Sequence, residues 1–313
     1  MLARWCVIEG PGRHHSDYWL LIRIEQETMS ELWKYLKYGR RILMGQIPAG
    51  RRLTVFPDDV FLVSYPRSGN TWTRFLTGNL LDQEDPVTFA NIESRIPEIY
   101  FFPDKVLRHL PRPRILKSHE YFDHRYKRVV YIVRDPRDVA TSMYHYSVKR
   151  RNIPDTYPIE EFVPRFMKGE FLEDFGTWDE HVSSWHATRQ NKAGFVFLRF
   201  EDMLADPGRE LGRMARLLEV DAAPEAVARA VELSSVAQMR RLEDQQGQSW
   251  KLTRESRQDK PFVRSARSGA WRSELPPRSV QQIESEWGDL MRGLGYELSC
   301  SKAPAGKPAL ARL

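Results

Sequence analysis

The chain has 313 residues, of which 41% are hydrophobic and 12% aromatic, enough for a sizeable core. Its formal net charge of +6 favours anionic ligands without choosing between phosphate esters, nucleic acid and acidic surfaces. Because its two cysteines are far apart in sequence, we expect a cytoplasmic protein with no zinc site. No apolar run approaches the roughly 18 residues of a membrane helix, so we expect no membrane span.

The first 28 residues are expected to be an extension of the main domain. MLARWCVIEGPGRHH does not have the form of a secretory signal, because Gly10, Pro11 and Gly12 interrupt it and no small-residue cleavage site follows. The first amphipathic helix is expected over 29–43, which raises the hypothesis that Met29 is the natural start. The main domain is expected over 29–300, with a frayed tail over 301–313.

Short apolar runs alternate with helical patterns along the main domain. Buried strands are predicted at 60–65, 114–117, 129–133 and 195–199, with helices at 71–81, 137–150, 159–168, 178–191 and, broken only at Pro224, 207–240. This alternation predicts one α/β domain with a central parallel sheet of four or five strands and helices on both faces. The polar stretch 243–268 is either a surface loop or a lid over a ligand.

The turn after the first strand, YPRSGNTW at 65–72, has the composition of an anion site. Gly69 allows a close backbone curl, Ser68 and Thr71 provide hydroxyls, and Arg67 provides a fixed charge. Backbone N–H groups at such a turn and helix start converge on a phosphate or sulfate oxygen. The turn lacks the second glycine and the Lys-Ser/Thr pair of the G-x-x-x-x-G-K-[ST] motif. An ordinary structural turn is the alternative.

Five motifs, in order, resemble those of the cytosolic-type sulfotransferases, which bind 3′-phosphoadenosine 5′-phosphosulfate (PAPS). YPRSGNTW resembles the family's donor loop Y-P-K-S-G-T-T-W, and ILKSH at 115–119 resembles its L-K-T-H, which carries the catalytic histidine. RVVYIVRDPRDVATSMYHY at 128–146 resembles its segment for the 3′-phosphate. FVFLRFEDMLADP at 195–207 and FVRSARSGAWR at 262–272 resemble its strand-to-helix junction and its R-K-G-x-x-G-x-W-K motif. The resemblance implies a P-loop-like fold and PAPS as donor.

The resemblance also implies which residues bind the donor. The turn would hold the phosphosulfate, Arg134 with Ser142 the 3′-phosphate, and Trp72 the adenine. The alternatives are a salt bridge from Arg134 to Asp135 or Asp138, and a core position for Trp72. The expected donor site is Arg67, Ser68, Gly69, Asn70, Thr71, Trp72, Arg134, Ser142, Phe200, Ser234 and Arg264.

His119 is the expected general base, because the pKa of an imidazole lies near neutral pH; His145 is the runner-up. Lys117 and Arg67 would stabilise charge on the bridging oxygen of the leaving phosphate. Arg67 replaces the lysine of the family's loop and cannot act as an acid, so a proton for the leaving group must come from Lys117 or from water. Side-chain cations are expected to neutralise the transferred group without a metal.

The predicted function is transfer of a sulfuryl group from PAPS to a hydroxyl of a small organic acceptor. The aromatic residues of IYFFPD at 99–104, with Tyr121, Phe122 and Tyr144, are candidates for lining the acceptor cleft, with core packing as the alternative role for at least half of them. The first alternative is a nucleoside-kinase-like phosphotransferase, which would need magnesium and a Lys-Ser/Thr loop. A non-catalytic nucleotide- or nucleic-acid-binding protein is the second, but the basic residues are scattered, so no nucleic-acid partner is expected. The acceptor's identity and the oligomeric state stay open.

Overall fold

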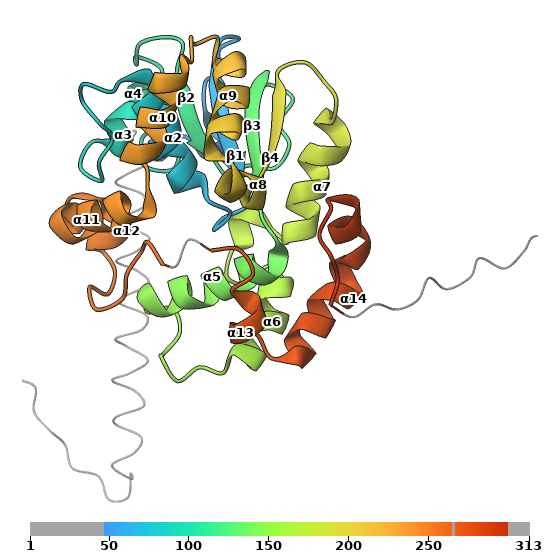
Figure 1. The fold of residues 1–313 in the computed structure, drawn as a ribbon. Helices are drawn as coiled ribbons and strands as arrows, with labels where there is room; N and C mark the ends of the chain where they lie inside the picture. Colours follow the sequence, from blue (N-terminus) through green and yellow to red (C-terminus); the bar gives the residue numbers. More distant parts are fainter. Residues whose placement is uncertain (1–46, 265–266, 300–313) are drawn as a thin grey trace, which may run out of the picture. The chain divides into compact units, whose positions relative to one another are not determined.

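The centre of the fold is a sheet of four parallel strands in the order β2-β1-β3-β4 (Figure 1). β1 (Val60–Ser64) pairs with β2 (Ile115–Ser118) and with β3 (Arg128–Val133), and β3 pairs with β4 (Phe195–Arg199). This computed structural model describes residues 47–264 and 267–299. The expected extension at 1–28, the helix at 29–43 and the tail at 301–313 lie outside the described residues, and the described residues from Ala49 onward form one compact unit.

Alternate side chains of each strand enter different parts of the core. Phe61 and Val63 of β1 belong to one buried cluster, whereas Leu62 between them belongs to another. In β3, Tyr131 and Val130 divide in the same way. Because both faces of the sheet are covered, the strands are continuous apolar runs. The predicted α/β class with a parallel sheet is therefore confirmed, with four strands.

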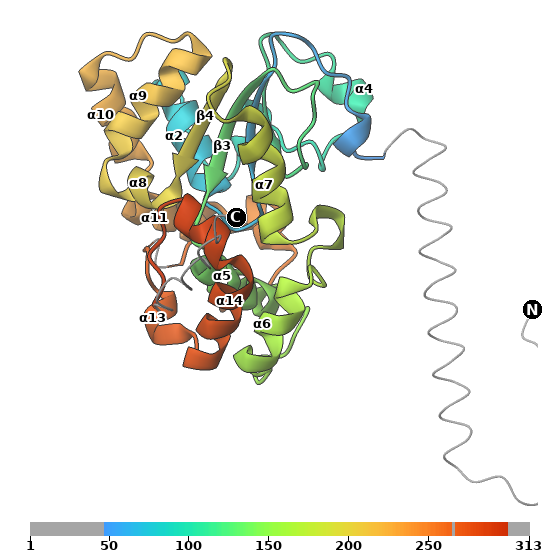
Figure 2. The same cartoon turned by 90° about the vertical axis from the view of Figure 1, so that its right-hand side faces the viewer.

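Helices cover both faces of this sheet. α2, α9 and α10 lie on one side and α7 lies on the other, while α5, α6, α13 and α14 gather beyond the carboxyl ends of the strands (Figure 2). The helical elements are η1 (Gly50–Arg52), α2 (Asn70–Leu81), α3 (Ile92–Arg95), α4 (Asp104–Leu107), α5 (Pro136–Lys149), α6 (Ile159–Met167), η2 (Glu173–Phe175), α7 (Trp178–Arg189), α8 (Phe200–Ala205), α9 (Pro207–Leu218), α10 (Pro224–Leu233), α11 (Val236–Gln246), η3 (Gly247–Ser249), α12 (Lys251–Arg254), α13 (Trp271–Glu274) and α14 (Pro277–Gly293).

The helical region predicted over 207–240 is broken before Pro224 as expected, but it has a second break that was not predicted. α9 ends where Glu219 adopts a left-handed conformation with φ of +58°, and a loop then leads to α10. A further break follows α10, because Ser235 caps a new helix by accepting a hydrogen bond from the N–H of Gln238. The region therefore contains three helices.

The stretch 243–268 is not a simple surface loop in its described part. It contains the end of α11, η3 and α12, and Phe262 and Val263 are buried in a third hydrophobic cluster. The Glu243 carboxylate accepts hydrogen bonds from the N–H groups of both residues. This arrangement holds the segment against the domain beside α5 and α11. None of the helices in the described ranges is long and apolar enough to cross a membrane.

Candidate active site

A cavity of about 270 Å³ lies where the loops after the four strands meet. The carboxyl edge of an open parallel sheet is the usual place for a ligand in α/β proteins. All of the expected site residues line this cavity except Ser68 and Ser234. The sheet thus brings together segments that are separated in the sequence by up to almost 200 residues, from Arg67 to Arg264.

The turn between β1 and α2 is shaped by its backbone. Arg67 and Gly69 both have positive φ angles, +69° and +100°. A Cβ atom on Gly69 would lie 2.5 Å from the ring of Phe200, so only glycine fits there. Asn70 ties the start of α2 to the sheet, because its Nδ2 donates hydrogen bonds to the carbonyl of Leu62 and to Ser64 Oγ.

Ser68 lies under this turn with a side chain that fits an anionic ligand. It is completely buried, and its Oγ has no hydrogen-bond partner among the described residues. A buried hydroxyl is normally paired, so an unpaired one at a helix N-terminus indicates a missing acceptor or donor.

The side chain of Arg67 is directed toward α5. Its Nε donates a hydrogen bond to Ser142 Oγ at 3.1 Å, and its guanidinium lies 4.6 Å from the ring centre of Tyr146 and 5.1 Å from that of Phe262. Burial lowers the pKa of Arg67 to about 10, so the side chain is still charged at neutral pH. Arg67, which is expected at the phosphosulfate, therefore contacts Ser142, which is expected at the 3′-phosphate.

Arg134 follows β3 and donates hydrogen bonds to the turn after β1 and to the segment before α13. Its Nη1 donates to the carbonyl of Arg67 at 3.3 Å and its Nη2 to that of Arg267 at 3.1 Å, while its guanidinium lies 4.4 Å from the ring centre of Phe200. Its Nε is buried and without a partner among the described residues. Burial lowers the pKa of Arg134, which makes an anionic partner favourable.

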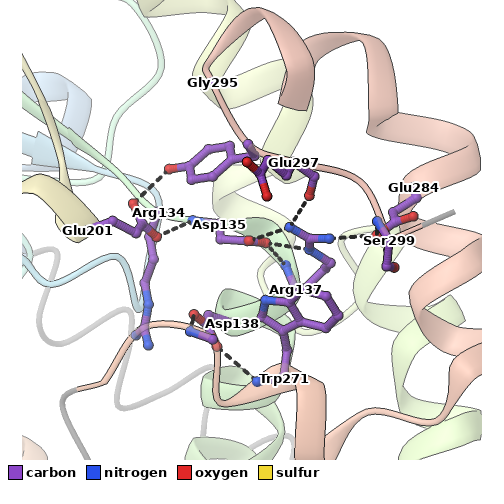
Figure 3. Close-up of polar contacts among 12 residues, drawn as sticks. Arg134, Asp135, Arg137, Asp138, Glu201, Trp271, Glu284, Gly295, Glu297 and Ser299 are labelled. Atoms are coloured by element: carbon purple, nitrogen blue, oxygen red, sulfur yellow. Dashed lines mark hydrogen bonds and ion pairs between the residues drawn. The ribbon is translucent and has the colours of Figure 1, made fainter. Parts of the chain in front are cut away.

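The carboxylates considered as salt-bridge partners of Arg134 make other contacts. Asp135 accepts hydrogen bonds from Nε and Nη2 of Arg137 (Figure 3). Asp138 accepts hydrogen bonds from the backbone N–H groups of Gly269 and Trp271. The side chain of Arg134 is thus not held by the two aspartates that follow it in sequence.

Arg264 and His145 meet at the same carboxylate. Nη2 of Arg264 lies 3.0 Å and 2.9 Å from the two oxygens of Glu274 on α13, and Nε2 of His145 lies 2.6 Å from one of them. Arg264 lines the cavity, whereas His145 does not. His145 is therefore less well placed than His119 to act on a ligand in this cavity.

Trp72 and Ser234 contact each other at the edge of the cavity. Nε1 of Trp72 donates to the carbonyl of Ser234 at 3.0 Å, and its ring meets that of Phe200 edge-on. The hydroxyl of Ser234 accepts a hydrogen bond from Asn79 and is fully buried. Trp72 thus has a face in the cavity wall and a structural partner, while Ser234 contributes backbone rather than its hydroxyl.

His119 has a fixed tautomer. Its Nδ1 lies 2.6 Å from the carbonyl oxygen of Ser64, which can only accept, so Nδ1 carries the proton and Nε2 of the neutral ring has the free lone pair. Burial, with a smaller contribution from the charge of Lys117, holds the pKa of His119 well below its usual range. The ring of Phe175 meets His119 edge-on at 5.5 Å, and this geometry suits a buried neutral base.

Two further interactions were not expected from the sequence. Nζ of Lys117 forms an ion pair with Glu98 at 2.6 Å. The carbonyl of His119 accepts a hydrogen bond from Nε2 of His181 on α7, whose Nδ1 in turn accepts one from the hydroxyl of Tyr131. Only the three-dimensional fold brings these residues together.

The aromatic residues considered for the acceptor cleft or the core lie outside the lining of the described cavity. None of residues 99–104, Tyr121, Phe122 or Tyr144 lines the described cavity. Phe122 packs against Trp185, whereas Tyr100 lies beside His119, with its hydroxyl accepting the N–H of His119 at 3.0 Å. The cavity lining includes the apolar or aromatic side chains of Met143, Tyr146, Leu172 and Phe175, and the ring of Phe175 contacts that of His119.

Comparison with known proteins decides the family. The model of the sulfotransferase domain matches residues 57–295, which is most of the chain and includes all of the site described above. The chain belongs to the sulfotransferase family. Sulfotransferase 1B1 of Canis lupus familiaris is 29% identical over 201 residues, covering 59% of this chain and 67% of its own length. Cytosolic sulfotransferase 12 of Arabidopsis thaliana is 26% identical over 300 residues, covering 87% and 89%.

A solved structure shares the fold of this sulfotransferase. Retinol dehydratase, in a complex with androsterone and the inactive cofactor PAP, superimposes with a TM-score of 0.65 at 21% identity, covering 78% of this chain and 83% of its own. The P-loop-like fold inferred from the motifs is therefore confirmed. Within 47–264 and 267–299, no group of three or more His, Cys, Asp or Glu side chains is arranged to hold a metal ion.

Proposed function

We propose that this sulfotransferase moves a sulfuryl group from PAPS to a hydroxyl of a small organic acceptor, with His119 as the general base and without a metal. The observation that carries the proposal is the fixed tautomer of His119, whose basic Nε2 belongs to a ring in the wall of a cavity with three arginines. The relatives' names and the PAP in the solved neighbour support the donor. The name of the plant relative also supports a cytoplasmic location.

The residues of the turn and of α5 fit the anionic parts of such a donor. The backbone N–H groups at the start of α2 and the unpaired Ser68 hydroxyl would bind oxygens of one anionic group. Arg67, Ser142 and the free Nε of Arg134 would bind another. When bound, PAPS supplies a sulfur–oxygen bond that can break with a phosphate as leaving group.

His119 would accept the proton of the acceptor hydroxyl at Nε2. The hydrogen bond from Nδ1 to Ser64 would strengthen as the ring becomes positive, which favours proton uptake during the reaction. The hydrogen bond from His181 to the His119 carbonyl holds the backbone of this segment in place. The pairing of Lys117 with Glu98 limits the repulsion between Lys117 and the imidazolium.

Transfer from radiolabelled PAPS to a panel of phenols, alcohols, sugars and sterols, in excess chelator, tests this function. We expect labelled products with the intact chain. His119→Gln should lower kcat by about 10²- to 10⁴-fold, while calorimetry shows PAP still bound. The exposed His124 provides the matched control, His124→Gln, with activity unchanged. Activity that chelator abolishes would favour the kinase-like alternative, and undiminished turnover in His119→Gln would remove His119 from the mechanism.

A further inference from the structure

A buried ion pair between Lys117 and Glu98 is built into the cavity wall by the backbone. The segment before β2 forms a parallel bridge with it, in which the N–H of Lys117 donates to Pro97 and the N–H of Ile99 donates to Lys117. This register places Glu98 beside Lys117, with Oε2 2.6 Å from Nζ. Only 6% of Glu98 and 4% of Lys117 is exposed, so the fold rather than side-chain flexibility sets the contact.

The other charged groups near Lys117 leave Glu98 as its partner. On α2, Arg74 forms an ion pair with Glu93 of α3 at 2.9 Å. Glu93 also accepts the N–H of Glu98, at 2.9 Å. His119, beyond the end of β2, is neutral for the reason given above. The carboxylate of Glu98 is therefore the main group that offsets the ammonium of Lys117, with a smaller contribution from Glu93.

A gain in stability does not by itself explain why Lys117 and Glu98 form a buried ion pair. Two charges removed from water lose hydration, and an apolar pair of the same size is often no less stable. Lys117 is the only lysine that lines the described cavity, because Arg67 stands where the family's loop has one. Guanidinium groups keep their protons. Among the cationic side chains of the described cavity wall, Lys117 is therefore the one best suited to release a proton.

We propose that Glu98 is a positioning residue for Lys117, which it holds in the cavity wall and keeps protonated until Lys117 protonates the leaving group. This rests on the proposed sulfuryl transfer. The acceptor oxygen forms a bond to sulfur, and its proton passes to His119 Nε2. The bond from sulfur to the bridging oxygen breaks with its electron pair on that oxygen, which receives a proton from Lys117 Nζ. Glu98 exchanges no proton.

The geometry gives Glu98 a measurable effect on Lys117. Burial lowers the pKa of Lys117, and the charge of Glu98 opposes that effect. An opposite charge in close contact typically shifts a pKa by about one to three units. Glu98→Gln, which keeps the shape and removes the charge, should therefore lower the pKa of Lys117 by about one unit or more. Glu98→Asp keeps the negative charge and should change the pKa of Lys117 by no more than about half a unit.

The first test measures the pKa of Lys117 without any ligand. Side-chain NMR of isotopically labelled lysine follows its Cε resonance against pH, with Lys117→Arg assigning the signal. A pKa of Lys117 that is equal in the wild type and Glu98→Gln would overturn the proposal. If Glu98→Gln does not fold, Glu98→Ala takes its place, and a pKa of Lys117 equal to that of the wild type would again overturn the proposal.

The second test separates a role in the reaction from a structural one. In the wild type, kcat at saturating substrates should fall at alkaline pH as Lys117 loses its proton, and Glu98→Gln should move that fall to lower pH. Lys117→Arg should abolish it, and adding Glu98→Gln to Lys117→Arg should change nothing further. An equal shift in both backgrounds would overturn the proposal.

Calorimetry with PAP keeps failure of this inference distinct from failure of the proposed function. Glu98→Gln should bind PAP at least as tightly as the wild type, since it removes a negative charge from an anion site. Clearly weaker binding by this variant would contradict the proposal. If the wild type itself neither binds PAP nor transfers sulfate, the proposed function fails, whereas the NMR titration still decides whether Glu98 holds the proton on Lys117.

Discussion

Replacing Asp138 by Asn tests whether α5 holds the segment before α13 over the cavity. One carboxylate oxygen of Asp138 accepts the N–H of Gly269 at 2.7 Å, and the other accepts that of Trp271 at 3.1 Å (Figure 3). Asn has one acceptor oxygen and one amide group, so it can satisfy only one of these N–H groups and directs a donor at the other. The variant should therefore loosen this segment.

The size of the effect follows from the contacts that are lost and kept. A hydrogen bond to a charged group contributes about 1.5–3 kcal/mol, so local opening should become about 10- to 150-fold more frequent. Arg134 still donates to the carbonyl of Arg267, and the guanidinium of Arg137 still lies 3.9 Å from the ring centre of Trp271. These contacts should keep the opening local, with the sheet unaffected.

Hydrogen exchange followed by mass spectrometry measures this directly. Peptides that cover 267–272 should exchange about 10- to 150-fold faster in Asp138→Asn, whereas peptides from β1 and β3 should keep their rates. Asp289→Asn, at an exposed position paired with Arg292 on α14, provides the control and should change nothing near α13. Unchanged protection of 267–272 would refute the idea that Asp138 anchors the segment, and equal acceleration everywhere would mean global destabilisation instead.

Three further outcomes are expected. Arg67→Lys keeps a charge but loses the Nε–H bond to Ser142, so calorimetry should show PAP binding weaker by up to about tenfold. Gly69→Ala combines a positive φ with a contact to Phe200, and its melting temperature should fall by several degrees, corresponding to about 1–2 kcal/mol or more. On lowering the pH, kcat/KM should begin to fall only below pH 6.5, because His119 must be neutral to accept a proton and burial lowers its pKa below the usual 6.5. A fall of kcat/KM that begins above pH 6.5 would contradict the role of His119 as the base.

The strands were predictable because each is a short apolar run between turns. Phe195–Arg199 matches the observed β4, and the other strands begin or end within a residue or two of their expected limits. Helix limits depended on local capping that a periodic pattern does not show. The break at Ser235, for example, depends on its side chain and on a backbone turn rather than on proline or glycine.

Long-range partners could not be predicted from the motifs. Lys117 and Glu98 are 19 residues apart, and a bridge outside the main strands sets their register. Asp138 stands in the expected phosphate segment, but its partners, the N–H groups of Gly269 and Trp271, are backbone groups with no sequence signal. A sequence motif indicates which residues lie at the carboxyl edge of the sheet. Which of these residues contact one another depends on the conformations of the loops between the strands and helices.

The contact between Arg67 and Ser142 changes how the two anion-binding regions relate to each other. With φ at +69°, Arg67 leaves the turn toward α5, and Arg134 donates to its carbonyl, so the cationic side chains of the turn and of the segment after β3 line the same cavity. Under the proposed function, these arginines serve the phosphates, and the reacting end depends on Lys117 and His119. Arg67, which stands where the family's loop has a lysine, is then compatible with proton transfer, because Lys117 on the neighbouring strand β2 supplies the proton. In that arrangement, loss of Lys117 should impair turnover far more than loss of Arg67, whose removal should act mainly on donor binding.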